Sequence, residues 1–469
     1  MPTPPNAIPS LFYEYLLSHL LMAVTSIAVA LTLVKLLATN RAPQSLIAWI
    51  LALVFMPAVA VPFFLLLGSR KFPRSAKRTM GLLAPDQPYA DSHPIARAMR
   101  RVGAAPVREN NLLELLGGAE VAYHRLLELI DTAQRSISVN MFIVGDDEVG
   151  WTVLQRLAAR ARAGVKVRCV LDAVGSRKVM RRARRMLAAE GGEVRSFMPL
   201  IHAPLRGRTN LRCHRKLVVC DDMQVFVGGM NLALEYMGPA PWPGRFVDLA
   251  AVATGDIALD ASAVFESDWA FCAGQNPPAH WSLPRTNEHH ASGVMQLVPS
   301  GPDMREDTFY NGLLTALATA QERIALVTPY YVPDDVVQRS LQIAARRGVR
   351  TQLIMPLRSN HPLADFARRG LLRELANAGV ELFFYPDAMV HAKAMVVDDG
   401  FAYIGSPNVD MRSLFLNYED ALFLYDPAHV QLVAAWIDTL LAGCTRTAPK
   451  YKRELWLFEQ LARIVAPEL

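Results

Sequence analysis

Two stretches of the chain decide the fold because they repeat one another: residues 132–174, TAQRSISVNMFIVGDDEVGWTVLQRLAARARAGVKVRCVLDAV, and residues 319–356, TAQERIALVTPYYVPDDVVQRSLQIAARRGVRTQLIMP. Each stretch starts at the Thr-Ala-Gln end of a helix, enters a β-rich run and reaches an Asp-Asp pair. An amphipathic helix, a glycine turn and a second β-rich run follow. Such strand–helix–strand units form right-handed crossovers and buried, largely parallel sheets. We expect an α/β protein of two pseudo-twofold-related halves, with mixed, largely parallel sheets flanked by helices.

The Asp-Asp pair of each repeat stands immediately before the amphipathic helix. The pairs are Asp146 with Asp147 and Asp334 with Asp335. A carboxylate at this position accepts hydrogen bonds from the free N–H groups of the first helical turn. We therefore interpret both pairs as helix N-caps and not as catalytic groups.

The repeat also sets the expected domain boundaries. We place the first half at residues 106–285 and the second at 286–469, with the Pro-, Asn- and His-containing stretch 277–292 connecting them. Residues 71–105 are basic, lack a clear period and are expected to be a linker. Residues 1–70 are expected to form a two-helix membrane hairpin.

Two apolar runs in the N-terminal region lead to the membrane prediction. The first extends from Leu16 to Leu37 and the second, which contains no charge, from Leu46 to Leu67. Each is about long enough to cross a hydrocarbon layer of roughly 30 Å as a helix. Pro57 and Pro62 interrupt the second run, so we expect a kink there.

Basic residues predict the orientation of this hairpin. Five of them crowd the exit of the second run, whereas the connector side offers only Lys35 and Arg41; the five are Arg70, Lys71, Arg74, Lys77 and Arg78. The positive-inside rule places the large body in the cytoplasm, as in a two-pass protein of a bacterial inner membrane. The same cluster suits anionic head groups. Residues 1–15 contain no Lys or Arg, which argues against a cleaved signal peptide.

Composition and cysteine content agree with a membrane-attached enzyme. The chain is 52% hydrophobic and carries a formal net charge of +6, which suits an anionic lipid surface and would suit nucleic acid equally well. Its five cysteines lack metal-binding or disulfide spacing, so we expect free thiols at Cys169, Cys213, Cys220, Cys272 and Cys444.

Each half also contains one copy of a motif with identical internal spacing. The first copy consists of His214, Lys216, Asp221, Gly228, Gly229 and Asn231. The second consists of His391, Lys393, Asp398, Gly405, Ser406 and Asn408. A lone His-x-Lys would mean little, but two equally spaced copies inside one structural repeat are a highly specific signal.

The residue types of the motif fit phosphodiester chemistry. One histidine can attack phosphorus while the other donates a proton to the leaving oxygen, and the roles reverse in a second step. Two lysines and two asparagines can hold the non-bridging oxygens. The small residues Gly228, Gly229, Gly405 and Ser406 are expected to let the backbone approach the phosphate. Because each half supplies only half of this set, the two halves must face one another.

Each histidine needs a partner that fixes its tautomer. In the second half Glu419 follows the motif at a suitable distance, and in the first half Asp248 is the counterpart, with Glu235 as a nearer competitor. Asp221 and Asp398, which close the motifs, are assigned to structural hydrogen bonds and not to proton transfer.

Other candidate residues give weaker signals. Tyr330 and Tyr331 suit a lipid pocket and core packing about equally well. The remaining histidines show no metal-ligand spacing, so we expect no metal and no cofactor, and we interpret them as surface or loop residues: His202, His280, His289, His290 and His361. His202 lies shortly before the first motif and is the exception worth testing.

The two motif copies resemble the phospholipase D superfamily, and the wider match is similar to its bacterial cardiolipin synthases. Supporting stretches are residues 210–216, 296–303, 328–333 and 408–413. The resemblance implies a ping-pong reaction without metal. Phosphatidylglycerol would donate its phosphatidyl group to His214 and release glycerol. The hydroxyl of a second phosphatidylglycerol, deprotonated by His391, would then attack to give cardiolipin.

The chain departs from the family pattern at three places. Cys213 stands where the family often has Asn, Pro407 interrupts the second Gly–Asn segment, and Asn360-His361 occupies a region that often carries Asp-Ser. None of these removes a catalytic group, but the last can alter the choice of lipid acceptor.

Three functions remain open at this level. The first is transfer between phosphatidylglycerol molecules at an anionic membrane. The second is a phosphodiesterase acting on lipid or nucleic acid, or transfer to another acceptor such as phosphatidylethanolamine. The third is a catalytically silent scaffold. The surviving motif residues argue against the scaffold, and the apolar N-terminal runs argue against nucleic acid as a partner.

Overall fold

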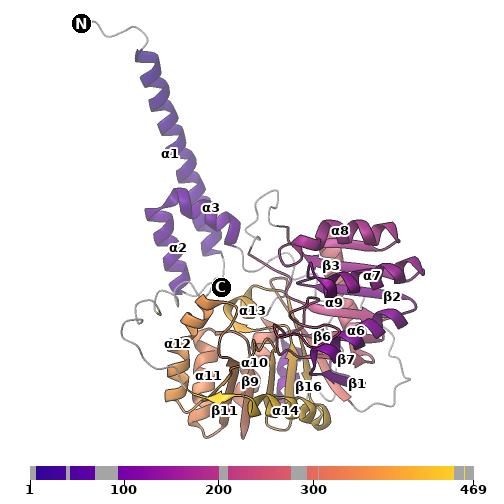
Figure 1. The fold of residues 1–469 in the computed structure, drawn as a ribbon. Coiled ribbons are helices and arrows are strands. Elements are labelled where there is room, and N and C mark those ends of the chain that lie inside the picture. The colour runs from indigo at the N-terminus through magenta and orange to yellow at the C-terminus, as the bar shows by residue number, and fades with distance from the viewer. Residues whose placement is uncertain are drawn as a thin grey trace. The chain divides into compact units, whose positions relative to one another are not determined.

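The structure is a computed structural model, and it describes residues 7–38, 43–68, 93–199, 210–275, 293–304, 306–447 and 459. The chain divides into two compact units, one with the N-terminal helices and one with nearly all of the remaining chain (Figure 1). The basic cluster after the second apolar run, the connection 277–292 and His202 lie outside the described residues.

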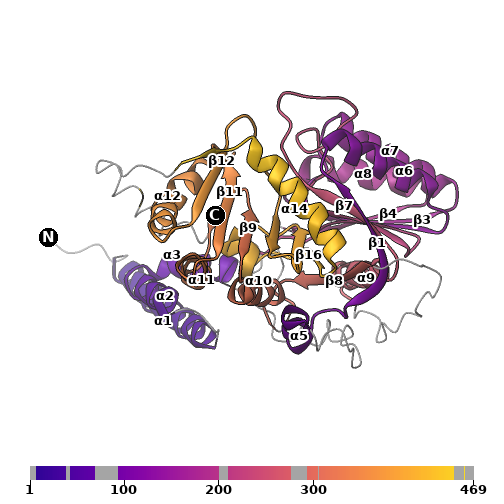
Figure 2. The ribbon, with the colours of Figure 1, turned by 90° about the horizontal axis from the view of Figure 1, so that it is seen from below.

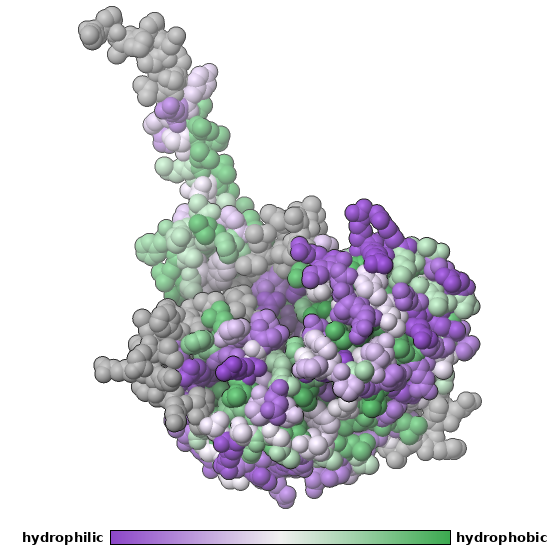
Figure 3. All heavy atoms as spheres, in the orientation of Figure 1, coloured by the Kyte–Doolittle hydropathy of each residue, from purple (hydrophilic) through white to green (hydrophobic). Residues whose placement is uncertain are grey.

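The N-terminal unit consists of α1 (Ala7–Leu37), α2 (Pro43–Phe55) and α3 (Pro57–Leu67). Among the residues that the structure describes, one helix, over Phe12–Leu37, is long and apolar enough to cross a membrane. Its surface is largely apolar (Figure 3). The three helices share a small apolar cluster of Leu36, Leu53, Ala60, Val61 and Phe64.

The second apolar run is not one spanning helix, in contrast to the expected hairpin. Helix α2 ends at Phe55 and α3 begins at Pro57, which stands at the first position of the new helix. Proline lacks the N–H that would continue the helical hydrogen bonds, and its ring clashes with the preceding turn. A break therefore replaces the expected kink at Pro57. Pro62 lies inside α3 without ending it.

The body is built from two similar series of elements. The first series is α5 (Pro94–Arg101), β1 (Arg108–Leu116), α6 (Ala119–Thr132), β2 (Ser136–Met141), α7 (Glu148–Arg162), β3 (Lys166–Asp172), α8 (Arg177–Ala189), β4 (Glu193–Phe197), β5 (Lys216–Cys220), β6 (Gln224–Gly228), β7 (Ala250–Thr254) and α9 (Ile257–Ala273). The buried face of α5 belongs to the core of the second half, so the expected linker 71–105 is wrong in its last third.

The second series follows the same plan. It comprises β8 (Gly293–Ser300), α10 (Thr308–Thr319), β9 (Arg323–Val327), β10 (Tyr331–Val332), α11 (Asp335–Arg346), β11 (Arg350–Pro356), α12 (Pro362–Asn377), β12 (Glu381–Tyr385), β13 (Ala394–Val397), β14 (Phe401–Gly405), β15 (Val409–Asp410), α13 (Met411–Phe415), β16 (Glu419–Leu424), α14 (Pro427–Ala442) and β17 (Thr445–Arg446).

One 15-stranded sheet joins the two halves, in the order β17-β12-β11-β9-β13-β14-β16-β8-β1-β7-β6-β5-β2-β3-β4. Read outward from the junction of β8 and β1, the first seven strands of the two halves correspond, and the second half adds β17 at its edge, so the expected pseudo-twofold relation is present. Helix α14 lies across strands of the second half and reaches β1 (Figure 2). Apolar residues of both halves meet in one core cluster beneath the sheet.

The sheet is mixed, as expected, but it is not largely parallel. Within this sheet, the parallel strand pairs are those of β2-β3-β4 and β9-β11-β12, where helices connect the strands. A separate sheet of the two-residue strands β10 and β15 and three isolated bridges are also parallel. The other described pairs are antiparallel, including the motif hairpins β5-β6 and β13-β14. Each hairpin turn is only a few residues long, whereas a parallel crossover needs a dozen or more.

The two repeats themselves are confirmed element by element. The Asp147 carboxylate accepts the N–H of Gly150, and the Asp334 carboxylate accepts the N–H of Val337. Both aspartates are thus the predicted N-caps. Gly164 and Gly348 stand in the turns that follow α7 and α11, and their φ angles of 92° and 94° suit glycine. All five cysteines are free thiols, as expected.

Candidate active site

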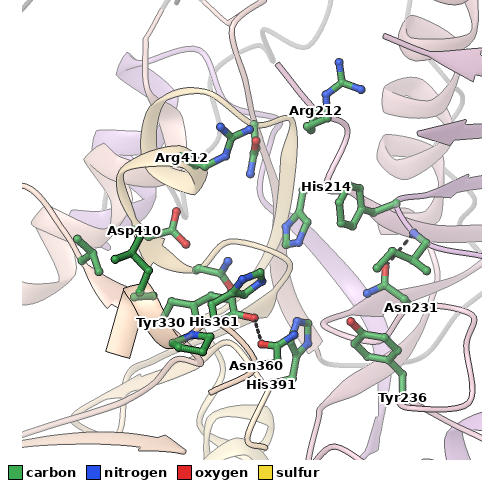
Figure 4. Close-up of a pocket in the computed structure, with 18 residues that line it drawn as sticks. Arg212, His214, Asn231, Tyr236, Tyr330, Asn360, His361, His391, Asp410 and Arg412 are labelled. Atoms are coloured by element: carbon green, nitrogen blue, oxygen red, sulfur yellow. Dashed lines mark hydrogen bonds between the residues drawn. The ribbon is translucent and has the colours of Figure 1, made fainter. Parts of the chain in front are cut away.

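The two motifs begin the corresponding strands β5 and β13, and short backbone contacts hold them together across the halves. The N–H of His214 donates to the carbonyl of Tyr418 at 2.8 Å, and the N–H of His391 donates to the carbonyl of Val247 at 2.7 Å. Each histidine is therefore tied to the segment that enters β16 or β7 of the opposite half. Both imidazoles lie in one pocket (Figure 4).

Each histidine has a carboxylate partner, and the partners are exchanged between the halves. Nδ1 of His214 lies 2.8 Å from Oε2 of Glu419, and Nδ1 of His391 lies 2.7 Å from Oδ2 of Asp248. The expected pairing inside each half is therefore wrong, although both expected carboxylates contact a motif histidine. The backbone contacts across the halves cause the exchange. Glu235 is exposed.

Burial lowers the pKa of both motif imidazoles and so favours their neutral forms. It lowers the pKa of His391 to about 3, assisted by the neighbouring Lys393 ammonium. It also lowers the pKa of His214. Burial opposes the charge of Glu419 and Asp248, but the facing histidines and lysines outweigh it and hold both carboxyl pKa values below their usual range. A neutral imidazole beside an ionised carboxylate is the state that can attack phosphorus or accept a proton.

The two motif lysines are buried beside the histidines. Nζ of Lys216 donates to the carbonyl of His214 at 2.6 Å, and Nζ of Lys393 lies 3.0 Å from Nε2 of His391. Burial lowers the pKa of Lys216 to about 8 and that of Lys393 to about 7. A bound phosphodiester would supply the missing negative charge and favour both ammonium forms.

The pocket has a volume of about 310 Å³ and is lined by both halves. Among its lining residues are Phe142, Arg212, His214, Asn231, Tyr236, Tyr330, Asn360, His361, His391, Asn408, Asp410, Arg412 and Asn417. Oδ1 of Asn231 accepts the N–H of Ile143 at 3.1 Å, which fixes the side chain at the pocket wall (Figure 4). The predicted asparagines Asn231 and Asn408 thus both reach the site.

The small residues of the motifs have a different role from the one expected. A Cβ at Gly229 would lie 2.1 Å from Oδ1 of Asp248, and the Ser406 hydroxyl donates to Oε2 of Glu419 at 2.5 Å. A Cβ at Gly228 or Gly405 would lie 2.5 Å from a carbonyl of the neighbouring strand. None of the four lines the pocket. Gly229 and Ser406 therefore accommodate the two carboxylates, and Gly228 and Gly405 accommodate the backbone of the neighbouring strand.

The two adjacent tyrosines point to opposite environments. Tyr330 lines the pocket and its hydroxyl donates to Oδ1 of Asn360 at 2.5 Å. Tyr331 is fully buried, and its hydroxyl donates to Oε1 of Gln338 at 2.7 Å. Successive side chains of an extended segment alternate in direction, so only one of the two can face the pocket. The pocket prediction is therefore wrong for Tyr331.

Asp221 and Asp398 hold tight turns at the far ends of the motif strands. Asp221 accepts the N–H groups of Gln134, Arg135 and Ser136, and Asp398 accepts the equivalent three of residues 321–323. Both have left-handed φ angles, 57° and 49°. A five-residue strand of roughly 16 Å separates Asp221 from the site. The structural role expected for both is the one seen.

Several pocket residues are not found by motif reasoning. Phe142 packs edge-on against the His214 ring, and Tyr236 packs edge-on against the His391 ring, both with centroids 5.0 Å apart. Phe142 lies in the first repeated stretch, at the position of Tyr330 when the Asp-Asp pairs are aligned, so the repeat was a usable signal for it. Tyr236 belongs to neither the repeated stretches nor the two motifs. Asp410 and Arg412 stand in the stretch 408–413 that carried the family resemblance, so their sequence position was a usable signal. His361 is exposed, as expected, but it also lines the pocket.

The two motif histidines line one cavity, and each is contacted by one lysine and one carboxylate. Among the residues that the structure describes, no group of three or more His, Cys, Asp or Glu side chains could hold a metal ion. Together with the duplicated α/β fold, this arrangement defines a phospholipase D-like protein that acts on phosphodiesters.

Comparison with known proteins narrows this class. A family model described as cardiolipin synthase, PLD-like domain, matches residues 126–242 and 313–441. The chain is 32% identical to cardiolipin synthase A of Pseudomonas aeruginosa over 458 residues, covering 92% of each chain. It is 31% identical to the cardiolipin synthase of Geobacillus kaustophilus over 432 residues, covering 88% of this chain and 86% of the relative. The chain belongs to the cardiolipin synthase family.

A solved structure supports the fold. The phosphatidylserine synthase of Haemophilus influenzae matches with a TM-score of 0.61 at 16% sequence identity, covering 80% of this chain and 99% of that one. At this identity the likeness shows the shared fold alone.

Proposed function

We propose that this cardiolipin synthase joins two phosphatidylglycerol molecules into cardiolipin and releases glycerol. The observation that carries the proposal is the convergence of His214 and His391 in one pocket, each with its own buried carboxylate. Two such imidazoles can divide nucleophilic attack and proton transfer between them.

The first step forms a bond between His214 and phosphorus. Nε2 of His214 attacks the phosphodiester and the bond to the glycerol oxygen breaks. His391, whose protonated form is favoured by the negative charge of the bound phosphodiester, donates the proton that leaves with glycerol. Lys216, Lys393 and the two asparagines hold the non-bridging oxygens. The assignment of His214 as nucleophile rests on the superfamily resemblance. The crossed carboxylates support either histidine in this role.

The second step reverses the proton transfer. His391, now neutral, accepts the proton from a hydroxyl of the second phosphatidylglycerol, and the resulting oxygen attacks phosphorus. The bond between phosphorus and His214 breaks and cardiolipin leaves. Water in place of the lipid hydroxyl would give phosphatidic acid, so transfer requires that the pocket exclude water after glycerol departs.

Product analysis with labelled phosphatidylglycerol tests this function. Purified protein in vesicles should yield cardiolipin and glycerol in equal amounts. Phosphatidic acid as the sole product would establish a hydrolase instead. A second reaction that includes phosphatidylethanolamine tests the choice of lipid, because this lipid would release ethanolamine as a donor and would keep its ethanolamine in the product as an acceptor.

Two substitutions test the two-histidine route. We expect His214→Ala and His391→Ala each to abolish cardiolipin formation while the protein stays in the membrane fraction. Substantial transfer by either variant would contradict the proposal.

We also propose that both apolar N-terminal runs lie in the membrane and that the body faces the cytoplasm. The 26-residue apolar part of α1 spans roughly 39 Å at 1.5 Å per residue. Helices α2 and α3 pack against α1 and carry no charge from Leu46 to Leu67, which supports a return path. A Gln44→Cys variant should react with a membrane-impermeant thiol reagent from outside intact cells. Labelling only after lysis would contradict this topology.

A further inference from the structure

We propose that the start of α12 forms a lipid-binding surface that turns the mouth of the catalytic pocket toward an anionic bilayer. This surface, here called the α12 rim, consists of Leu357, Arg358, Pro362, Leu363 and Phe366. The inference rests on the proposed phospholipid substrate and adds the means by which the body meets the bilayer.

Three large apolar side chains of the rim are exposed. Leu357 is 45% exposed, Leu363 43% and Phe366 37%. Leu363 and Phe366 are three residues apart in the first turns of α12, so they share one face of the helix. Single exposed apolar residues are ordinary on a protein surface, but a contiguous group beside a functional site indicates a binding surface.

The rim is continuous with the catalytic pocket. Pro362 and Leu363 line that pocket, as do the preceding Asn360 and His361, which lie near Tyr330 (Figure 4). Pro362 also lines a second cavity of about 460 Å³, whose walls include Leu357, Arg358 and Phe366. Apolar surface therefore continues from the mouth of the catalytic pocket across the start of α12.

Charge and rigidity fit an anionic lipid layer. Arg358 is exposed beside Leu357, so its guanidinium can meet head-group phosphates while the apolar side chains enter the interfacial layer. Arg368 is buried beneath the rim. It donates to the carbonyls of Pro356 and Leu357 at 3.1 and 3.2 Å and pairs with Asp365 at 2.8 Å. These contacts hold the segment before α12 in place.

The chemistry of the substrate explains why such a surface is useful. The head group of a phospholipid must reach histidines that are 8% and 4% exposed, while its acyl chains stay in an apolar environment. An apolar helix can keep the enzyme at the membrane, but it does not orient the pocket. A rim with apolar and cationic side chains at the pocket mouth supplies that orientation.

The test compares vesicle-bound with water-soluble substrate. A Leu357→Ser/Phe366→Ser variant should form cardiolipin about tenfold more slowly from long-chain phosphatidylglycerol in phosphatidylcholine vesicles, because roughly two apolar contacts with lipid are lost. Its rate on a short-chain, monomeric phosphatidylglycerol should equal that of the unmodified protein. Neither residue lines the catalytic pocket.

Matched controls use exposed apolar residues elsewhere on the body. Val121 is 58% exposed on α6 and Leu432 is 44% exposed on α14, so Val121→Ser and Leu432→Ser should change neither rate. Likewise Arg358→Glu should slow the vesicle reaction, whereas Arg339→Glu, at an exposed position of α11, should not.

Three results would overturn the rim proposal. These are an unchanged vesicle rate in the double variant, an equal loss on both substrates, and dissociation of an assembly of this chain by the substitutions, which would make the rim a protein interface. Failure of the proposed function is distinguishable, because the unmodified protein would then form no cardiolipin from either substrate.

Discussion

Each motif histidine has its own carboxylate partner, and the two partners are exchanged between the halves. Glu419 contacts His214 and Asp248 contacts His391, although each carboxylate belongs to the other half. Substitution of one carboxylate should therefore perturb the imidazole of the opposite motif. The same exchange makes each half of the chain incomplete without the other.

Glu419→Gln should act on His214. Loss of the carboxylate charge should lower the pKa of His214 further and reduce kcat by roughly 10²- to 10⁴-fold, as loss of a triad carboxylate does. Imidazole NMR titration should show the shift at His214 and leave His391 unchanged. Asp248→Asn is the matched control and should show the reverse. A shift at His391 in Glu419→Gln would contradict the crossed arrangement.

The two motif lysines, Lys216 and Lys393, are expected to determine how kcat/KM falls at alkaline pH. The pKa of Lys393 is lowered to about 7 and that of Lys216 to about 8, both chiefly by burial. Their positive charges are therefore present below these pH values and lost as the pH rises through them. Since kcat/KM reports ionisations of the free enzyme, it should fall above about pH 7 to 8.

The Lys393→Arg variant tests whether loss of the Lys393 charge causes the fall in kcat/KM. Arginine does not titrate in this range, so the lower alkaline step should disappear from the pH profile even if the absolute rate drops. Measurement of kcat/KM from pH 5 to 9 checks the shape. An unchanged step in the variant would assign the limb to another group.

At the scale of single residues, the sequence predicts which types meet but not their pairing. The identical spacing of the two motifs predicts His214, Lys216, His391 and Lys393 as site residues. The choice between Asp248 and Glu419 as partner of a given histidine depends on a long-range backbone contact that no local pattern records. The two tyrosines differ for a similar reason, because a one-residue change of position turns a side chain from the pocket to the core.

At the scale of elements, one buried arginine joins three segments. Arg215 precedes β5 and contacts Asp268 of α9 at 2.5 Å and Asp420 of β16 at 3.2 Å. Burial, together with neighbouring carboxylates, raises the pKa of Asp420 to about 7 even though Arg215 opposes the shift. The arginine is therefore the counter-ion of a buried acidic cluster that spans both halves.

Arg215→Met should strongly destabilise the body. Removing one partner of a buried ion pair costs about 3–5 kcal/mol, so we expect Tm to fall by roughly 5–15 °C. A carboxyl with a raised pKa favours the folded state when protonated and loses that contribution as the pH rises through the folded pKa. The decrease in Tm caused by Arg215→Met should therefore be smaller at pH 5 than at pH 8.

Thermal unfolding at the two pH values checks this prediction. Adding Asp268→Asn and Asp420→Asn to Arg215→Met should restore part of the lost Tm, because no buried charge remains unpaired. An equal deficit at both pH values would mean that lost packing, and not charge, causes the effect.

Some features of the helices and strands could be predicted from the sequence, and others could not. The repeat predicted the helices, their caps and the strand–helix–strand units, because these depend on local residue types. It did not predict the antiparallel majority of the sheet, in which short turns at Asp221 and Asp398 reverse the chain from β5 into β6 and from β13 into β14. The sequence predicts a kink at Pro57. The structure has a break between two helices there, because Pro57 is the first residue of α3.

For the whole molecule, the fold implies that one chain builds one complete active centre. The halves share a continuous sheet and a common core, and His214, His391 and both carboxylates lie within a single chain. Full-length His214→Ala and His391→Ala proteins, mixed and reconstituted in the same vesicles, should therefore form no cardiolipin.

Restored cardiolipin formation in the mixed sample would contradict this prediction. If centres were assembled from halves of two different chains, some mixed assemblies would contain both intact histidines, and activity would return in proportion to their share. The unmodified protein at half the concentration serves as the positive control for reconstitution. Because the crossed contacts of 2.8 and 2.7 Å already join the two halves of one chain, an exchange between chains would have to break both of them together with the junction of β1 and β8. Restored activity would show that this junction opens in the membrane.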